Sequence, residues 1–325
     1  MRHLQWLIPA AAAGIAGIVA AFTFSASSRP ALAGPLDARR AYGYLVDVCR
    51  VGPRPSGSRG MEQQQKLIVE HFEKHGGTVQ FQTFDAAHPL DGSPVRMSNI
   101  IVSWHPDAKE RVLLACHYDT RPFPDEDRFN PRGVFLGAND GASGVALFME
   151  LAHHLPRLKP TYGVDFVLFD GEELVFGREG EYFLGSKHFA LEYLGNSPAH
   201  RYVYGVLVDM IGDRSLNIYK ELNSLKYAPD LVDSVWATAR RLGVREFIDR
   251  RRHEVQDDHL PLNQIARIPT IDIIDFDYGP PENPYWHTTQ DVPQKCSGES
   301  LAKVGHVLLT WLESVPRPRG GGERR

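Results

Sequence analysis

Residues 164–173 read VDFVLFDGEE, a short apolar run that ends in three carboxylates around one glycine. Runs of this kind, rich in Val, Leu and Phe, are typical of central strands that are buried on both faces of a sheet. The chain contains three more of them: RVLLAC at 111–116, VYGVLV at 203–208 and PTIDII at 269–274. Stretches with a helical pattern alternate with these runs, at about 142–155, 186–194, 228–242 and 299–314. We therefore predict an α/β fold, a three-layer sandwich whose central, mostly parallel, twisted mixed sheet is flanked by helices.

Polar side chains that can bind a metal follow each of the four apolar runs, directly or after a loop. Because the ligand site of an open α/β sheet lies beyond the carboxyl ends of its strands, we expect these side chains to gather at one edge. We expect Asp140 at the same edge of the sheet, because it stands just before the helix that is predicted to begin at about residue 142. The whole set is His117, Asp119, Asp140, Glu172, Glu173, Asp209 and His287.

This set of side chains indicates a metal site. Converging carboxylates repel one another and raise one another's pKa values, and no Lys or Arg stands within these motifs. Imidazole and carboxylate ligands without thiolates fit a catalytic zinc site with one open position. The adjacent side chains of Glu172 and Glu173 point in different directions, so one can bind metal while the other acts as a general base. Taken singly, His117 also fits a structural histidine and Asp140 a helix N-cap; the order of the whole set favours the metal site.

The order of the motifs resembles the zinc aminopeptidase superfamily, the M28-like peptidases. The motifs that carry this resemblance are ACHYDT (115–120), GANDGASGVA (137–146), FDGEE (169–173), VDMIGD (208–213) and YWHT (285–288). Within the superfamily, QDDHLP (256–261) and the Trp286–His287 pair resemble the zinc-dependent glutaminyl-peptide cyclotransferases, the glutaminyl cyclases of animals and bacteria. The resemblance covers about residues 40–315 and implies the phosphorylase/hydrolase-like fold of the zinc aminopeptidases.

The resemblance also implies an activity: cyclisation of the N-terminal glutamine of peptides or proteins to pyroglutamate, with release of ammonia. It implies one zinc per chain, and it assigns a role to each matching residue. These are metal binding by Asp140, Glu173 and His287, catalysis by Glu172, Asp209 and Asp257, and substrate binding by Trp286 and Gln256.

Two other interpretations stay open at this point. In a di-zinc aminopeptidase, His117 would bind a second zinc together with Asp140 and Asp209, and Glu172 would activate water. A non-catalytic protein on the same fold is the third interpretation, and the intact ligand set argues against it.

The sequence departs from the cyclase pattern at two positions. Asp272 stands where cyclases usually carry a histidine, which puts the expected Asp–His network in doubt. Val145 stands where animal cyclases carry the cysteine that pairs with one like Cys116, so that bridge is absent. The three cysteines exclude a disulfide framework, but they leave open one bridge or three free thiols.

The ends of the chain differ from its middle. Residues 1–33 are predicted to be a signal peptide or an N-terminal membrane anchor, because an apolar run at 4–24 precedes Ala31-Leu32-Ala33. We expect export to the periplasm or the exterior, one catalytic domain at 34–315, and a disordered tail at 316–325. The net charge of -4 argues against nucleic acid as a partner. We expect a monomer whose partners are its peptide substrates.

Overall fold

The computed structural model describes residues 36–196, 199–279, 281 and 283–316. The chain divides by its internal contacts into residues 1–33 and 34–325, and all described residues belong to the second unit. The predicted leader and residues 317–325 of the predicted tail lie outside the described residues, so the predicted boundaries stay predictions. Among the helices of the described part, none has the length and apolar character that crossing a membrane requires.

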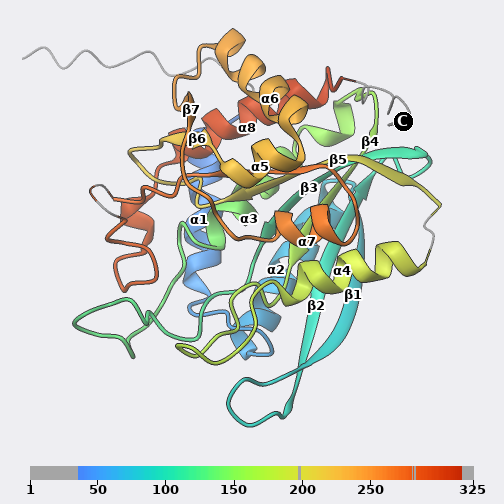
Figure 1. Ribbon diagram of the computed structural model, residues 1–325. Helices are drawn as coiled ribbons and strands as arrows, with labels where there is room; N and C mark the ends of the chain where they lie inside the picture. Colours follow the sequence, from blue (N-terminus) through green and yellow to red (C-terminus); the bar gives the residue numbers. More distant parts are fainter. Residues whose placement is uncertain (1–35, 197–198, 280, 282, 317–325) are drawn as a thin grey trace, which may run out of the picture. The chain divides into compact units, whose positions relative to one another are not determined.

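A six-stranded sheet forms the centre of this unit (Figure 1), with the strand order β1-β2-β4-β3-β5-β8. Its strands are β1 (Thr78–Ala87), β2 (Pro94–Trp104), β3 (Glu110–His117), β4 (Gly163–Phe169), β5 (Arg201–Asp209) and β8 (Thr270–Ile274). Strands β4, β3, β5 and β8 are parallel, and the β1–β2 hairpin pairs with β4 in the antiparallel sense. The predicted mixed, mostly parallel sheet is confirmed.

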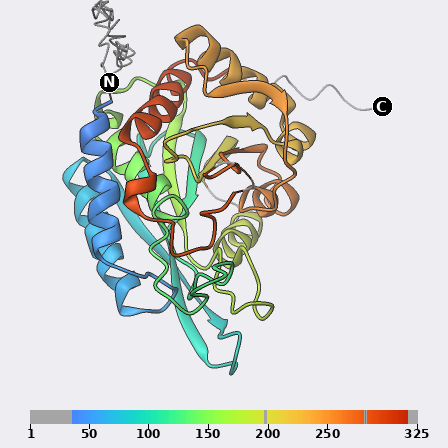
Figure 2. The ribbon, with the colours of Figure 1, turned by 90° about the vertical axis from the view of Figure 1, so that its left-hand side faces the viewer.

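Helices cover both faces of this sheet, as Figure 2 shows. One layer consists of α1 (Ala38–Arg50), α2 (Arg59–Lys74), α3 (Ala142–Leu151) and α8 (Gly298–Leu312). All ten residues of α3 are buried, because this helix lies between strands β3 and β5 and helices α1 and α8. A helix that is enclosed in this way is largely apolar all round, as its sequence ASGVALFMEL shows apart from Ser143 and Glu150.

The opposite layer contains α4 (Leu184–Gly195) and α7 (His259–Gln264), while α5 (Leu222–Tyr227) and α6 (Pro229–Leu242) lie near β8. Sequence patterns missed the short elements α5 and α7 and the separate strand pair β6 (Ile218–Lys220) and β7 (Phe247–Arg251). Two 3-10 helices, η1 (Leu155–Arg157) and η2 (Pro293–Lys295), complete the elements of the described residues. Elements of three to six residues are too short to show a hydrophobic period.

The three cysteines, Cys49, Cys116 and Cys296, are all buried and all unpaired. Of the two alternatives that the sequence left open, the structure has the three free thiols.

Candidate functional site

The predicted metal-binding side chains meet beyond the carboxyl ends of three neighbouring parallel strands. His117 and Asp209 are the last residues of β3 and β5, and Glu172 and Glu173 follow β4 through a turn at Gly171. Gly171 has a φ of +75°, and a Cβ atom there would lie 2.7 Å from the sulfur of Met97, so the turn requires glycine. The expectation that strand ends bring these residues together is confirmed.

Asp140, Glu173 and His287 have the spacing of metal ligands. The Nε2 atom of His287 lies 3.3 Å from Oδ2 of Asp140 and 3.4 Å from Oε2 of Glu173. Ligands about 2.0–2.1 Å from a tetrahedral zinc lie about 3.3–3.4 Å from one another, so these two distances match the edges of such a site. Oδ2 of Asp140 is buried and accepts no hydrogen bond from any described residue, which leaves it available to a cation. The three residues therefore fit a metal ion.

His117 extends this cluster on the other side of Asp140. Its Nε2 atom lies 3.2 Å from Oδ1 of Asp140 and 3.2 Å from Oδ1 of Asp209. Asp140 thus has one carboxylate oxygen near each of the two imidazoles. His117, Asp140 and Glu173 also offer ligand atoms that lie within 4.8 Å of one another. The arrangement can hold one divalent ion at His287 and has the residue types for a second at His117.

The electrostatics of the site reflect several buried carboxylates at close range. Burial and the carboxylate of Asp140 raise the pKa of Glu173 to about 7. Loss of water and the carboxylates of Glu173 and Asp257 raise the pKa of Glu172 well above its usual range, although His117 opposes this. Burial opposes protonation of His287, but its pairing with Asp140 and Glu173 raises its pKa above the usual value. A bound divalent cation would relieve this repulsion, as the sequence analysis expected.

One cation near the site was missed from the sequence. Arg121 directly follows the motif at 115–120, and its Nη1 atom lies 3.5 Å from Oε2 of Glu173. Its backbone N–H also donates to Oε1 of Glu173 at 2.8 Å. The expectation that no Arg or Lys neutralises these carboxylates is therefore wrong at Glu173. The guanidinium is shared with Asp125, to which it donates at 2.9 and 2.7 Å, so it offsets only part of the acidic charge.

A cavity of about 330 Å³ opens beside the ligand cluster. It is lined by Asp140, Glu172, Asp209, Gln256, Asp257, Phe276, Trp286 and His287, among others. The indole of Trp286 stacks on the imidazole of His287 with ring centroids 3.7 Å apart. The ring centroid of Phe276 lies 5.4 Å from that of Trp286. His287 has a φ of +54°, a strained conformation for a residue with a side chain, and such strain is concentrated at functional sites. All the residues that the sequence assigned to catalysis and substrate binding thus line one cavity, while their individual roles stay predictions.

A family model described as peptidase family M28 matches residues 99–312, about two thirds of the chain. The chain belongs to peptidase family M28. The match runs from within β2 to the end of α8, and it contains every residue of the ligand cluster described above.

The proteins that this chain resembles are named either as glutaminyl cyclases or as aminopeptidases. The crystal structure of Fimbriiglobus ruber glutaminyl cyclase is 40% identical, with a TM-score of 0.82, over 86% of this chain and 95% of that one. A structure named a leucine aminopeptidase precursor, from Bacteroides thetaiotaomicron, is 33% identical, with a TM-score of 0.80, over 86% of this chain and 98% of that one. The glutaminyl-peptide cyclotransferase of Bothrops jararaca is 26% identical over 290 residues, covering 80% of this chain and 76% of the relative.

Two further carboxylates hold the backbone of the ligand segments. Asp119 accepts hydrogen bonds from the backbone N–H groups of Glu172 and Glu173, at 3.1 Å each, so it positions both glutamates. Asp291 does the same for Asp140, because its carboxylate accepts from the N–H groups of Asn139 at 2.8 Å and Asp140 at 3.1 Å. The sequence analysis included Asp119 in the acidic set but did not predict this positioning role. Asp291 was not predicted at all, because it is 151 residues from Asp140 along the chain.

Asp272, the departure from the cyclase pattern, lies fully buried in β8. Neither of its carboxylate oxygens has a hydrogen-bond partner among the described residues, and the same holds for Oδ2 of Asp257. Burial and the carboxylate of Asp257 raise the pKa of Asp272 well above its usual range. A neutral carboxylic acid is therefore the form of Asp272 that this position favours.

Proposed function

We propose that this protein is a zinc-dependent glutaminyl-peptide cyclotransferase, which converts the N-terminal glutamine of peptides or proteins to pyroglutamate and releases ammonia. The observation that carries the proposal is one cavity whose lining includes the ligands Asp140 and His287 together with Glu172 and Trp286. The similarity to solved glutaminyl cyclases, at 40% identity for the Fimbriiglobus ruber enzyme, supports the same activity.

Asp140, Glu173 and His287 would hold one zinc ion. Their imidazole and carboxylate groups, without thiolates, are the ligand types of catalytic zinc sites. When bound, zinc supplies Lewis-acid polarisation of the carbonyl in the side-chain amide of the substrate glutamine. Asp119 and Asp291 keep the ligand segments in place through the backbone hydrogen bonds described above.

The residues of the chain carry out the proton transfers. Asp209 holds the α-amine of the substrate in the cavity, Asp257 assists it in stabilising the intermediate, and Glu172 accepts a proton from the amine. The amine nitrogen then forms a bond to the carbonyl carbon of the side-chain amide. Glu172 returns the proton to the amide nitrogen, the carbon–nitrogen bond breaks, and ammonia leaves. Burial raises the pKa of Glu172, and a carboxylate with a raised pKa accepts a proton more readily than an ordinary glutamate does.

The cavity walls help the substrate to close its ring. Both reacting groups belong to one glutamine residue, so the enzyme needs to fix only the side-chain torsions. Aligned intramolecular reactions gain up to about 7–11 kcal/mol from this effect. Trp286 and Phe276 form an aromatic wall beside the ligand cluster, which favours a folded glutamine side chain and excludes water from it.

One side-by-side assay tests the proposal. Purified protein is incubated with a peptide that begins with glutamine and, separately, with a leucine arylamide, and zinc is measured in the same sample. We expect ammonia and a pyroglutamyl peptide from the first substrate, no arylamine from the second, and one zinc per chain. Release of free amino acids without pyroglutamate would refute the cyclase assignment.

A di-zinc aminopeptidase is the second candidate, and one contact favours it. His117 lies 3.2 Å from both Asp140 and Asp209, which is the spacing a second zinc would require. Glu172 would then activate water for hydrolysis of the N-terminal peptide bond. Two zinc ions per chain together with release of arylamine in the same assay would establish this function instead.

We also propose that the protein is exported. Arg2 and His3, the apolar run at 4–24 and the Ala31-Leu32-Ala33 site have the order of a secretory signal. Determination of the N-terminal residue of protein from the producing cell tests this. A start near Gly34 supports cleavage, and an intact Met1 in a membrane fraction supports an anchor.

A further inference from the structure

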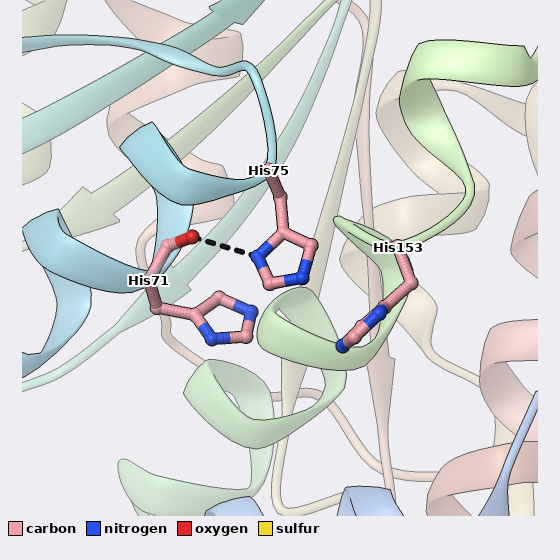
Figure 3. Close-up of side chains that lie close together, drawn as sticks. All are labelled: His71, His75 and His153. Carbon is pink, nitrogen blue, oxygen red and sulfur yellow. Dashed lines mark hydrogen bonds between the residues drawn. The ribbon is translucent and has the colours of Figure 1, made fainter.

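Three histidines lie close together at the ends of two helices. His71 and His75 are one turn apart at the end of α2, and His153 follows α3; their rings face a common space in Figure 3. One ring nitrogen of each histidine lies within 4.8 Å of those of the other two. The ten residues of α3, a length of about 15 Å, separate this cluster from Asp140. The histidine cluster is therefore distinct from the candidate active site.

Hydrogen bonds engage one nitrogen on each ring. Nε2 of His71 donates to the backbone carbonyl of Met149 at 2.8 Å, and Nδ1 of His75 donates to the carbonyl of His71 at 2.8 Å. Nε2 of His153 lies 2.6 Å from the hydroxyl of Tyr44. Among the described residues, no hydrogen bond involves the second nitrogen of these rings, so each ring retains one for another partner. Histidines that bind metals often have their other nitrogen held by a carbonyl or a polar side chain, and a metal here would bind either at these second nitrogens or in place of one of the hydrogen bonds above.

The charge state of the cluster suits a metal better than protons. The three histidines are half-buried, and burial lowers the pKa of His71 and the pKa of His153 to about 4. These two imidazoles are therefore neutral near pH 7, the form that binds metals. Arg40 is the charged group that most lowers the pKa of His153, and its guanidinium donates to Glu150 at 2.6 and 2.7 Å, which compensates its charge.

We propose that His71, His75 and His153 bind one divalent transition-metal ion that prefers imidazole, such as Zn²⁺, Cu²⁺ or Ni²⁺. A set of neutral nitrogens without a carboxylate selects these ions over Mg²⁺ and Ca²⁺. Nitrogens bound to one tetrahedral ion lie about 3.3–3.4 Å apart, so the rings must close by at most about 1.5 Å. Rotation of half-buried side chains can supply such a shift. The ion would link α2 to the end of α3, while Tyr44 ties the site to α1.

Zinc binding by the full-length protein tests this site independently of the proposed enzymatic function. The wild type and the variants His75→Gln, His153→Gln and His188→Gln are dialysed against the same free Zn²⁺ concentration, and bound zinc is counted per chain. His188 is the matched control, because it is also a half-buried helical histidine with a lowered pKa, but it stacks on Phe84 instead of on other histidines. We expect the two cluster variants to bind about one zinc fewer than the wild type and His188→Gln.

Two readouts separate the new site from the active site and from damage to the fold. Turnover of a glutamine peptide should be equal in all four proteins, because none of these residues lies in the catalytic cavity. With Cu²⁺ in place of zinc, the imidazole nitrogen couplings in the electron paramagnetic resonance spectrum should weaken only in the cluster variants. Equal zinc content in all four proteins would overturn the proposal, and so would an equal loss in His188→Gln.

Discussion

Buried charged groups at the two ends of the central sheet differ in whether other groups of the protein satisfy their hydrogen bonds. At the amino ends of β3 and β4, Arg111 and Asp165 form a buried ion pair with contacts of 2.7 and 2.6 Å. The guanidinium also donates to the backbone carbonyls of Trp104, His105 and Val164. Near the carboxyl ends of the same strands, Oδ2 of Asp140 and Nδ1 of His117 are buried and have no hydrogen-bond partner within the part of the chain that the structure describes.

This contrast shows which buried charges serve the fold and which serve chemistry. A buried ion pair is tolerated when hydrogen bonds satisfy all its polar atoms, and the Arg111–Asp165 pair meets that condition. Among the described residues, hydrogen bonds within the protein do not satisfy all the polar atoms of the carboxylates around Asp140. Polar atoms that the chain leaves unsatisfied at one location mark the place for an external cation.

The largest expected effect separates proton transfer from metal binding at the carboxyl end. Replacement Glu172→Gln should lower kcat about 10²–10⁴-fold, because the amide neither accepts nor returns the proton. Zinc content and the free energy of unfolding should stay as in the wild type, since the ligand cluster is intact. Steady-state kinetics and metal analysis check both. Wild-type kcat in this variant would remove Glu172 from the mechanism.

The second-largest expected effect concerns the Arg111–Asp165 ion pair at the amino ends of β3 and β4. Replacement Arg111→Met should destabilise the protein by about 3–5 kcal/mol, because it leaves Asp165 buried without its cation. The double variant Arg111→Met/Asp165→Leu should regain much of this loss, since it removes both charges. Urea unfolding of the three proteins measures the difference. A single variant as stable as the wild type would show that the pair contributes nothing at this end.

Metal binding should stabilise the protein only through the carboxyl end and the histidine cluster. Zinc at about 100 times its dissociation constant should raise the free energy of unfolding by about 2.7 kcal/mol per site. His287→Ala should lose the contribution of the active site, whereas Arg111→Met should keep it despite its lower starting stability. Thermal unfolding with and without a chelator tests this. The same gain in His287→Ala as in the wild type would exclude His287 as a ligand.

The smallest expected effect is an acid sensitivity from the histidine cluster. The folded-state pKa values of His71 and His153 are lowered to about 4 by burial, while an unfolded histidine titrates near 6.5. The unfolded state thus binds more protons between these values, so this contribution to stability is present above about pH 6.5 and is lost as pH falls toward 4. In metal-free protein, His71→Gln should reduce the fall in melting temperature over this range. An unchanged pH profile would contradict the lowered pKa.

Local patterns predicted most of the fold. The run at 111–116 became β3 at Glu110–His117, and the run at 164–169 became β4 at Gly163–Phe169. The helix expected at 228–242 is α6 at Pro229–Leu242. These elements are long or strongly apolar, so their hydrophobic pattern is visible in a short window of sequence.

By itself, the sequence also determined which residue types stand at the ends of the parallel strands, and hence that acidic and imidazole groups meet at one edge. Only the tertiary structure decided which of them touch: that Asp140 lies between His117 and His287, and that Arg121 reaches Glu173. The contact between His71 and His153 is of the same kind, because neither residue stands out in its local sequence. Contacts between residues far apart in the chain depend on how layers pack, and no local period of the sequence records that packing.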